Sequence, residues 1–191
     1  MAREFESELL VVGSRGLSDW QSLVRHSVSP DLLTAVDCPL LIVRGDKTMS
    51  VDRPRHVLLA LAGGDDIANA VRAAAAAASG SGSMVLVIHV IQAMVTAHDV
   101  AYVEPGEEAR ITIDTAIDML RQAGVEADGW VMRPGPVGET VADTAARWHA
   151  DIIVIGSARL GDLGSILFGS VTHDLLRATK VPVLIAEKSH A

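Results

Sequence analysis

The segment with the clearest chemical potential is a glycine-rich stretch, Gly156–Thr172, which lies between an aliphatic run and an amphipathic segment. It opens with Gly156 and closes with Gly169, Ser170 and Thr172. Glycines let a backbone approach a phosphate closely, and the amino terminus of a following helix offers unpaired N–H groups and a partial positive charge. The pattern is typical of an anion site, although a plain strand-to-helix connection has a similar composition.

Motifs for hydrolysis or dinucleotide binding are absent. Gly164–Gly169 has the spacing of a Walker A loop, but Ser170 stands where that motif requires lysine. The chain has no G-x-G-x-x-G and no G-x-S-x-G sequence. Asp162 is the one acidic residue of the loop, and it is typical of a solvated loop position. The loop therefore favours holding a nucleotide over hydrolysing it.

Other polar and aromatic residues favour structural roles. His89 lies inside an aliphatic run, which is typical of a core histidine. In two adjacent pairs, His98–Asp99 and His173–Asp174, we do not expect the side chains to face each other. The histidines have no zinc-binding spacing. The tryptophans lie too far apart in the sequence to predict a base-stacking platform; they are Trp20, Trp130 and Trp148.

Composition excludes several classes of protein. The 191 residues carry a formal charge of −8 with no basic stripe, which disfavours nucleic acid as a partner. Apolar runs fall short of the roughly 20 residues needed to span a bilayer. The one cysteine, Cys38, leaves no internal disulfide, and the charged amino terminus lacks the form of a signal peptide. We therefore expect a cytoplasmic protein without a membrane or nucleic-acid partner.

The chain contains an internal repeat. Glu8–Arg44 aligns without a gap with Asp151–Glu187 at an offset of 143 positions, and 15 of the 37 aligned residues are identical. The intervening segment has no partner upstream. The repeat predicts the last part of one domain (1–46), a polar linker (47–54) and a whole copy of that domain (55–188).

Aliphatic runs and amphipathic segments alternate through the whole copy. We expect strands at His56–Ala62, Met84–Ile91, Val125–Met132, Asp151–Ile155 and Val181–Ala186. The expected helices are one opened by Asp65 and Asp66, then Pro105–Ala123, Val137–His149 and Ser170–Thr179. This alternation predicts an α/β fold with a parallel sheet and right-handed crossovers, and the repeat adds an amino-terminal β-α-β fragment.

Three motifs of the whole copy resemble the universal stress protein family: Ile152–Ser157, Gly169–Thr172 and Val181–Ile185. The fragment has similar motifs at Leu9–Gly16 and Cys38–Arg44. The resemblance implies an open five-stranded parallel sheet in the order 3-2-1-4-5, with helices on both faces, of the adenine-nucleotide alpha-hydrolase-like kind. Many family members bind ATP where the winding direction of this sheet reverses.

The resemblance also implies a set of binding residues. The positions that would hold the phosphates and ribose are Gly156, Gly169, Ser170, Val171 and Thr172. The backbone of Val90 would meet the adenine. ATP, with Mg²⁺ accompanying it, is the implied cofactor.

Some positions depart from the family pattern. Arg159 stands at the second glycine of the motif, where its guanidinium could pair with phosphate or fill the cradle. Ala62 replaces the aspartate that usually ends the first strand in the family. The fragment has His26 at the third glycine and lacks the strands that would complete a pocket.

Two main hypotheses for function follow. The first is a regulatory stress-response module that binds an adenine nucleotide without turnover and is therefore not an enzyme. The second is a nucleotide-free interaction protein of the same fold that works through dimerisation. A weak ATPase is disfavoured, because no general base or metal-binding carboxylate accompanies the loop. In the family the last strand commonly mediates dimerisation, so we expect Leu40–Val43 to pair with Val183–Ala186, in the same chain or in another. We therefore predict an obligate homodimer or a domain-swapped assembly.

Overall fold

The computed structural model describes residues 8–14, 38–44, 53–61, 67–80, 82–91, 93–95, 100–102, 106–156 and 170–186. Its larger sheet consists of β1 (Leu10–Ser14), β2 (Leu40–Arg44), β3 (His56–Leu61), β4 (Met84–Val90), β7 (Glu126–Met132), β8 (Ile152–Ile155) and β9 (Val183–Ile185). A separate hairpin consists of β5 (Ala93–Val95) and β6 (Val100–Tyr102). The described helices are α3 (Ile67–Ala77), α4 (Gly106–Gln122), α5 (Val137–Arg147) and α6 (Ser170–Ala178).

The larger sheet has the order β1-β2-β9-β8-β3-β4-β7. All neighbouring strands in it are parallel except β2 and β9, which are antiparallel. In the whole copy the strands therefore follow the order 3-2-1-4-5, because β3 is the first strand of that copy and lies between β4 and β8. The predicted strand order is confirmed.

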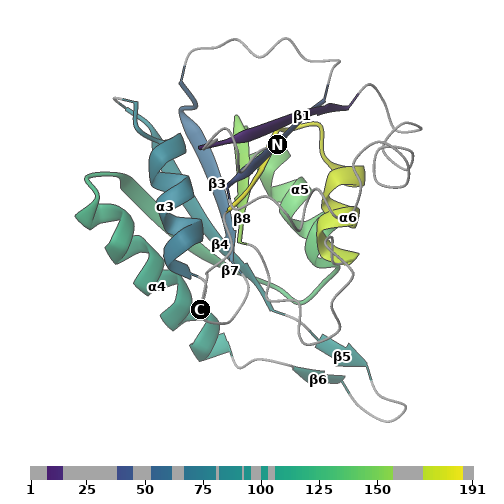
Figure 1. The fold of residues 1–191 in the computed structure, drawn as a ribbon. Coiled ribbons are helices and arrows are strands. Elements are labelled where there is room, and N and C mark those ends of the chain that lie inside the picture. Colours follow the sequence, from purple (N-terminus) through teal and green to yellow (C-terminus); the bar gives the residue numbers. More distant parts are fainter. Residues whose placement is uncertain are drawn as a thin grey trace.

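Helices cover both faces of this sheet, with α3 and α4 on one face and α5 and α6 on the other (Figure 1). The central strands are continuous aliphatic runs because both of their faces are buried. Leu59 and Val154 pack under α3 and α4, whereas Leu58 and Ile153 pack under α5 and α6. Each of these four side chains is fully buried. The core therefore has two halves, one on each face of the sheet.

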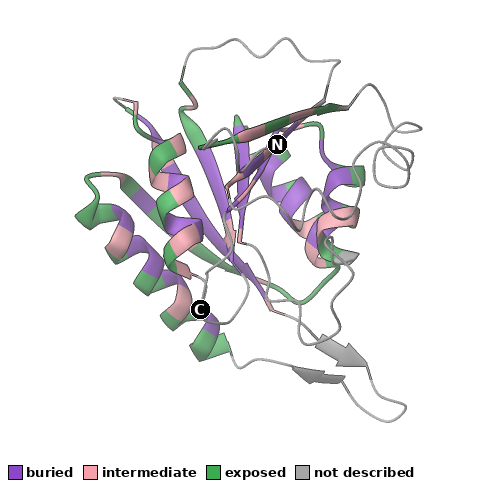
Figure 2. Cartoon of the chain, viewed as in Figure 1, coloured by how far each residue is buried: buried purple, intermediate pink, exposed green. Residues whose placement is uncertain are grey.

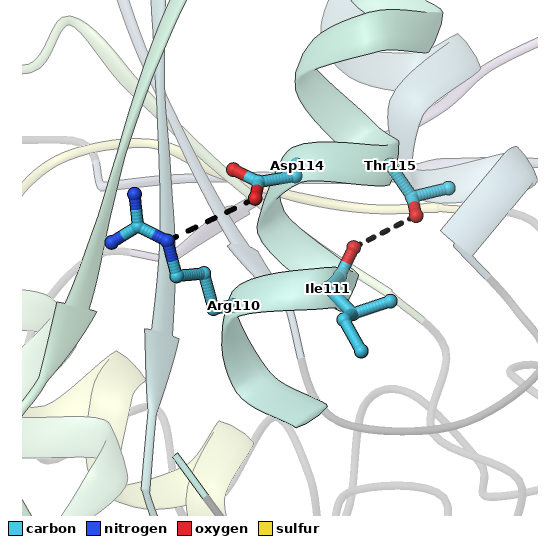
Figure 3. Close-up of polar contacts among 4 residues, drawn as sticks. All are labelled: Arg110, Ile111, Asp114 and Thr115. Carbon is cyan, nitrogen blue, oxygen red and sulfur yellow. Dashed lines mark hydrogen bonds and ion pairs between the residues drawn. The ribbon is translucent and has the colours of Figure 1, made fainter. Parts of the chain in front are cut away.

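The helices follow local signals in the sequence. Glu107 and Glu108 lie in the first turn of α4 and Arg121 in its last turn, which suits the helix dipole. Gly124 ends this helix with a φ of 78°, a left-handed conformation that glycine adopts without strain. On the outer face of α4, Arg110 Nε lies 3.9 Å from Asp114 Oδ2, and Thr115 Oγ1 donates to the Ile111 carbonyl (Figure 3).

The structure moves the predicted boundaries by at most two residues wherever it describes them. The strand expected at Val181–Ala186 shortens to β9, and the helix expected at Val137–His149 ends at Arg147. The β5–β6 hairpin was not predicted, because its strands have only three residues each and carry no turn motif. Asp65 and Asp66, and the helix expected within the fragment, lie outside the described residues.

The repeat is visible at the level of single hydrogen bonds. Leu10 N–H donates to the Pro39 carbonyl at 2.9 Å, and its counterpart Ile153 N–H donates to the Pro182 carbonyl at 2.9 Å. Strands β1 and β2 thus reproduce the parallel pair β8 and β9. The last strands of the two copies then pair within one chain, with Leu41 opposite Leu184. The pairing expected between them is confirmed.

Candidate functional site

The direction in which successive strands are added to the sheet reverses at β3. Strands β4 and β7 lie on one side of β3, and β8 and β9 lie on the other. Ala60 pairs with Ile155, so the two strands end at the same level of the sheet. Loops that leave such neighbouring ends diverge to opposite faces and open a crevice in which α/β proteins bind ligands. Gly156 follows β8 directly and is half-buried at this edge. The structure thus places it at the predicted switch point.

Packing among the described residues does not require a glycine at position 156. A Cβ built there would lie 3.7 Å from the Cβ of Ala70, which is an ordinary van der Waals contact. The backbone of Gly156 also lacks a positive φ that would demand glycine. The missing side chain therefore leaves room at the end of β8, which a ligand group can approach.

Helix α6 begins at the same edge of the sheet. Strands β8 and β9 are parallel, so the helix that connects them starts where β8 ends. Its first turn contains Val171, which is exposed, and Thr172, which is half-buried. This turn contains no acidic residue, so no carboxylate competes for the unpaired N–H groups and the positive end of the dipole. The start of α6 is thus electrostatically suited to an anion.

Gly138 holds α6 in place, a role that sequence reasoning missed. A Cβ at this position would lie 2.6 Å from the backbone nitrogen of Leu175 and 2.8 Å from the Val171 carbonyl oxygen. Only glycine lets α5 and α6 approach this closely. The signal that could have revealed it is a glycine inside the first turn of a helix, where it lowers helix propensity by about 1 kcal/mol relative to alanine.

Val90 ends β4, on the other side of β3 from Gly156. Neighbouring strands lie about 4.8 Å apart, so the two backbones are separated by roughly 10 Å across β3. The side chain of Val90 is buried in the core. Only its backbone can therefore serve a ligand at this edge. His89 is almost fully buried beside it, which agrees with the expected core histidine.

Several predicted site residues lie outside the described part of the chain. These are Arg159 and Gly169, with the neighbouring positions Ala62, Asp162 and His26. Ser170 begins α6, but its side chain is not described. Their roles stay predictions. Among the described residues, the edge brings together Val90, Gly156 and the first turn of α6.

One expectation about other residues was wrong. His173 Nδ1 lies 3.5 Å from Asp174 Oδ1 on α6, so these adjacent side chains do contact each other, at the surface. Trp130 and Trp148 are distant in sequence, yet they line one groove of about 330 Å³ between β7 and α5. Arg147 lines it with them. The groove forms because β7 and α5 are consecutive elements of the chain, with Trp130 on the strand and Trp148 at the end of the helix.

The described residues contain no group of three or more His, Cys, Asp or Glu residues that could hold a metal ion. None of the helices described is long and apolar enough to cross a membrane.

Comparisons with known proteins give a consistent match. The model of the universal stress protein family matches residues 1–44 and 54–187. The chain is 27% identical over 194 residues to a universal stress protein of Mycobacterium tuberculosis (strain ATCC 25618 / H37Rv), covering 96% of this chain and 63% of that relative. It therefore spans less than two thirds of the length of this curated relative.

Solved structures share the fold. A universal stress protein from Archaeoglobus fulgidus DSM 4304 has a TM-score of 0.69 and 19% identity, covering 97% of this chain and 63% of that one. A universal stress protein from Archaeoglobus fulgidus in complex with dAMP has a TM-score of 0.53 and 26% identity, covering 69% and 96%. Because the family model matches most of its residues, the chain belongs to the universal stress protein family.

Proposed function

We propose that this chain is a regulatory module that binds an adenine nucleotide at the edge formed by the ends of β3 and β8, without turning it over. The observation that carries the proposal is Gly156, whose missing side chain leaves room for a ligand group at the end of β8. The first turn of α6, which starts at the same edge of the sheet, has no acidic residue. The relative solved with dAMP, which is 26% identical, supports an adenine nucleotide as the ligand.

Each residue of the site has a proposed role. The phosphates would lie over Gly156, with the first N–H groups of α6 and the hydroxyls of Ser170 and Thr172 as donors. Gly169 would allow close backbone approach, and the backbone of Val171 would contact the ribose or phosphates. The guanidinium of Arg159 would pair with phosphate oxygens. The backbone of Val90 would meet the adenine.

A bound nucleotide would stay intact at this site. Hydrolysis needs a base that positions and deprotonates water, and the first turn of α6 offers no carboxylate. We propose that Mg²⁺ arrives with the nucleotide, held by its phosphates. The nucleotide-bound form of the chain, as distinct from the nucleotide-free form, would then be the regulatory signal. A phosphate release rate that scales with added protein would contradict this role and favour the weak ATPase.

We also propose that the chain consists of a fragment of one domain (1–46), a linker (47–54) and a whole domain (55–188). We place its function in the cytoplasm. Inside the described sheet both edges of β9 and both edges of β2 are occupied. A homodimer through these last strands would therefore have to exchange the β1–β2 pair between copies, as in domain swapping.

The first test is mass spectrometry of small molecules released when the purified protein is denatured, with calorimetric titration of ATP. We expect about one adenine nucleotide per chain, or a measurable binding heat. Gly156→Ala should weaken binding by at least tenfold with little change in stability, because its Cβ fills the space above β8. The matched control is Gly13→Ala at the equivalent position of the fragment, where a Cβ meets none of the described atoms within 4 Å.

The outcomes separate the two hypotheses. Bound nucleotide that is lost in Gly156→Ala and kept in Gly13→Ala supports the proposed site. No released nucleotide and no heat would overturn it and favour the nucleotide-free interaction protein.

A further inference from the structure

The two faces of β7 are covered unequally. On one face α4 packs so closely that a Cβ at Gly129 would collide with the side chain of Ile113. The next residue, Trp130, points to the opposite face, because side chains alternate along a strand, and it is 45% exposed. Figure 2 shows β7 largely exposed beside the buried β4. Strand β7 therefore presents a large, partly uncovered apolar ring.

Helix α5 forms the other wall of a groove beside this ring. It packs against α6 and over β4, and one further stripe of its side chains lines the groove. The stripe has the spacing of three and four residues that places side chains on one face of a helix. Its members are Thr140, Asp143, Thr144, Arg147 and, just after the helix, Trp148. The groove of about 330 Å³ lies at the lower end of the range of roughly 300–1,000 Å³ for ligand sites, so it suits a small molecule.

The indole of Trp148 is fixed by neighbours of its own. The ring of His56 lies 5.0 Å from it at an angle of 59°, and the Trp148 N–H donates to the Thr144 carbonyl at 2.9 Å. Met132 of β7 adds a thioether to the same groove. Flat rings pack favourably against indoles in offset or edge-to-face arrangements, and thioethers contact ring edges. The groove is therefore suited to an aromatic ring.

Two charged side chains of the stripe are available beside these rings. Asp143 and Arg147 are four residues apart on α5, and both are exposed. At the same spacing on α4, Arg110 Nε lies 3.9 Å from Asp114 Oδ2. Among the described residues Asp143 and Arg147 form no such ion pair, although an acid four residues before a base is the more favourable order in a helix. The groove thus offers a ligand one anionic and one cationic group.

We propose that this groove binds a small zwitterion with an aromatic ring, of the class of the free aromatic α-amino acids. The ring of the ligand packs between Trp130 and Trp148. Its carboxylate pairs with the guanidinium of Arg147, whose planar fork suits bidentate contact, and its ammonium group pairs with Asp143. The site shares no residue with the proposed nucleotide site and goes beyond that function.

Other ligands of similar size match the charges less well. Asp143 would repel a simple aromatic anion, and Arg147 would repel a simple aromatic cation. An aromatic residue inside a polypeptide has neither a free ammonium group nor a free carboxylate, so it would leave both side chains without a partner. A zwitterion satisfies both charges and the two indoles, so we commit to it.

The first test is calorimetric titration of the 191-residue chain with L-phenylalanine, L-tyrosine and L-tryptophan. We expect at least one of them to bind. Three analogues of L-phenylalanine should bind about tenfold or more weakly, because each lacks one recognised group: phenylacetate, phenethylamine and L-alanine. No binding heat with any of the three amino acids at millimolar concentration would overturn the proposal. Equal binding of N-acetyl-phenylalanine amide would overturn it in favour of an aromatic residue of a polypeptide.

Charge variants test the role of each group. Arg147→Gln should weaken binding of the amino acid about tenfold and abolish its preference over phenethylamine, which lacks the carboxylate. Asp143→Asn should likewise abolish the preference over phenylacetate, which lacks the ammonium group. The matched controls are Arg110→Gln and Asp114→Asn on α4, which should leave affinity and both preferences unchanged. Preferences that survive in the α5 variants would contradict the proposed contacts.

A last pair of variants locates the ring. Trp130→Ala should weaken binding about tenfold, whereas Ile111→Ala, at another exposed apolar residue (60%), should not change it. In NMR spectra the indole N–H signals of Trp130 and Trp148 should shift on addition of the amino acid. Binding that is lost in Gly156→Ala and kept in Trp130→Ala would place the ligand at the nucleotide site and overturn the proposal.

Discussion

Strands β1–β2 and β8–β9 form the same parallel pair from closely related residues, with the equivalent hydrogen bonds at Leu10 and Ile153 both 2.9 Å long. Their surroundings differ. Ile153 is fully buried beneath α5 and α6, whereas Leu10 is only half-buried. The local pairing is therefore a property of the strands themselves. Burial is a property of the neighbours, and most of the stability comes from burial.

The largest expected effect tests this difference directly. Ile153→Ala removes buried methyl and methylene groups from the core and should lower the free energy of unfolding by about 3–4 kcal/mol. The equivalent Leu10→Ala should lower it by about 1 kcal/mol, because its side chain is already partly hydrated. Urea denaturation measures both values. Equal losses would mean that both strand pairs lie in equivalent cores.

The next largest effect concerns the close contact between α5 and α6. Gly138→Ala should lower the free energy of unfolding by about 1–3 kcal/mol, since overpacking of the α5–α6 contact outweighs the gain of about 1 kcal/mol in helix propensity. Thermal and urea unfolding measure this loss, and ATP titration should show weaker binding as α6 shifts. The matched control is Gly106→Ala in the first turn of α4, where a Cβ meets Ile91 at an ordinary 3.7 Å. A stabilised Gly138→Ala variant would contradict the close approach.

A smaller effect distinguishes the two acidic residues at equivalent positions. Asp151→Ala removes the acceptor for two backbone amides at the start of β3 and should lower the free energy of unfolding by about 1–2 kcal/mol. Glu8→Ala in the 191-residue chain should change it by less than about 0.5 kcal/mol. Chemical denaturation of the two variants gives the comparison. A loss in Glu8→Ala as large as that in Asp151→Ala would show that Glu8 already anchors a strand.

Much of the fold could be predicted because its signals are local. Aliphatic runs such as Ile152–Ile155 predict buried strands, and a glycine after an amphipathic segment, such as Gly124, predicts the end of a helix. The repeat then predicted that β1–β2 would match β8–β9. The position of Gly156 at the end of β8 followed from the same reasoning, because the carboxyl ends of parallel strands meet at one edge.

The parts that could not be predicted depend on distant residues. The role of Gly138 comes from the backbone of α6, more than thirty positions later in the sequence. Trp130 and Trp148 share a groove only because α5 packs beside β7. The β5–β6 hairpin is too short to leave a periodic pattern.

The alternation of strands and helices and the glycine-rich stretch after Ile155 follow from the amino-acid sequence alone, since each depends on residues close together in the chain. The repeat follows from it too, because it needs only a comparison of the chain with itself. The pairing of β2 with β9 within one chain could be seen only in the folded protein, as could the burial of Val154 under α3 and the exposure of Val11. Burial depends on which elements pack together, and these elements are distant in the sequence. Equivalent strands therefore differ in exposure and stability when their neighbours differ.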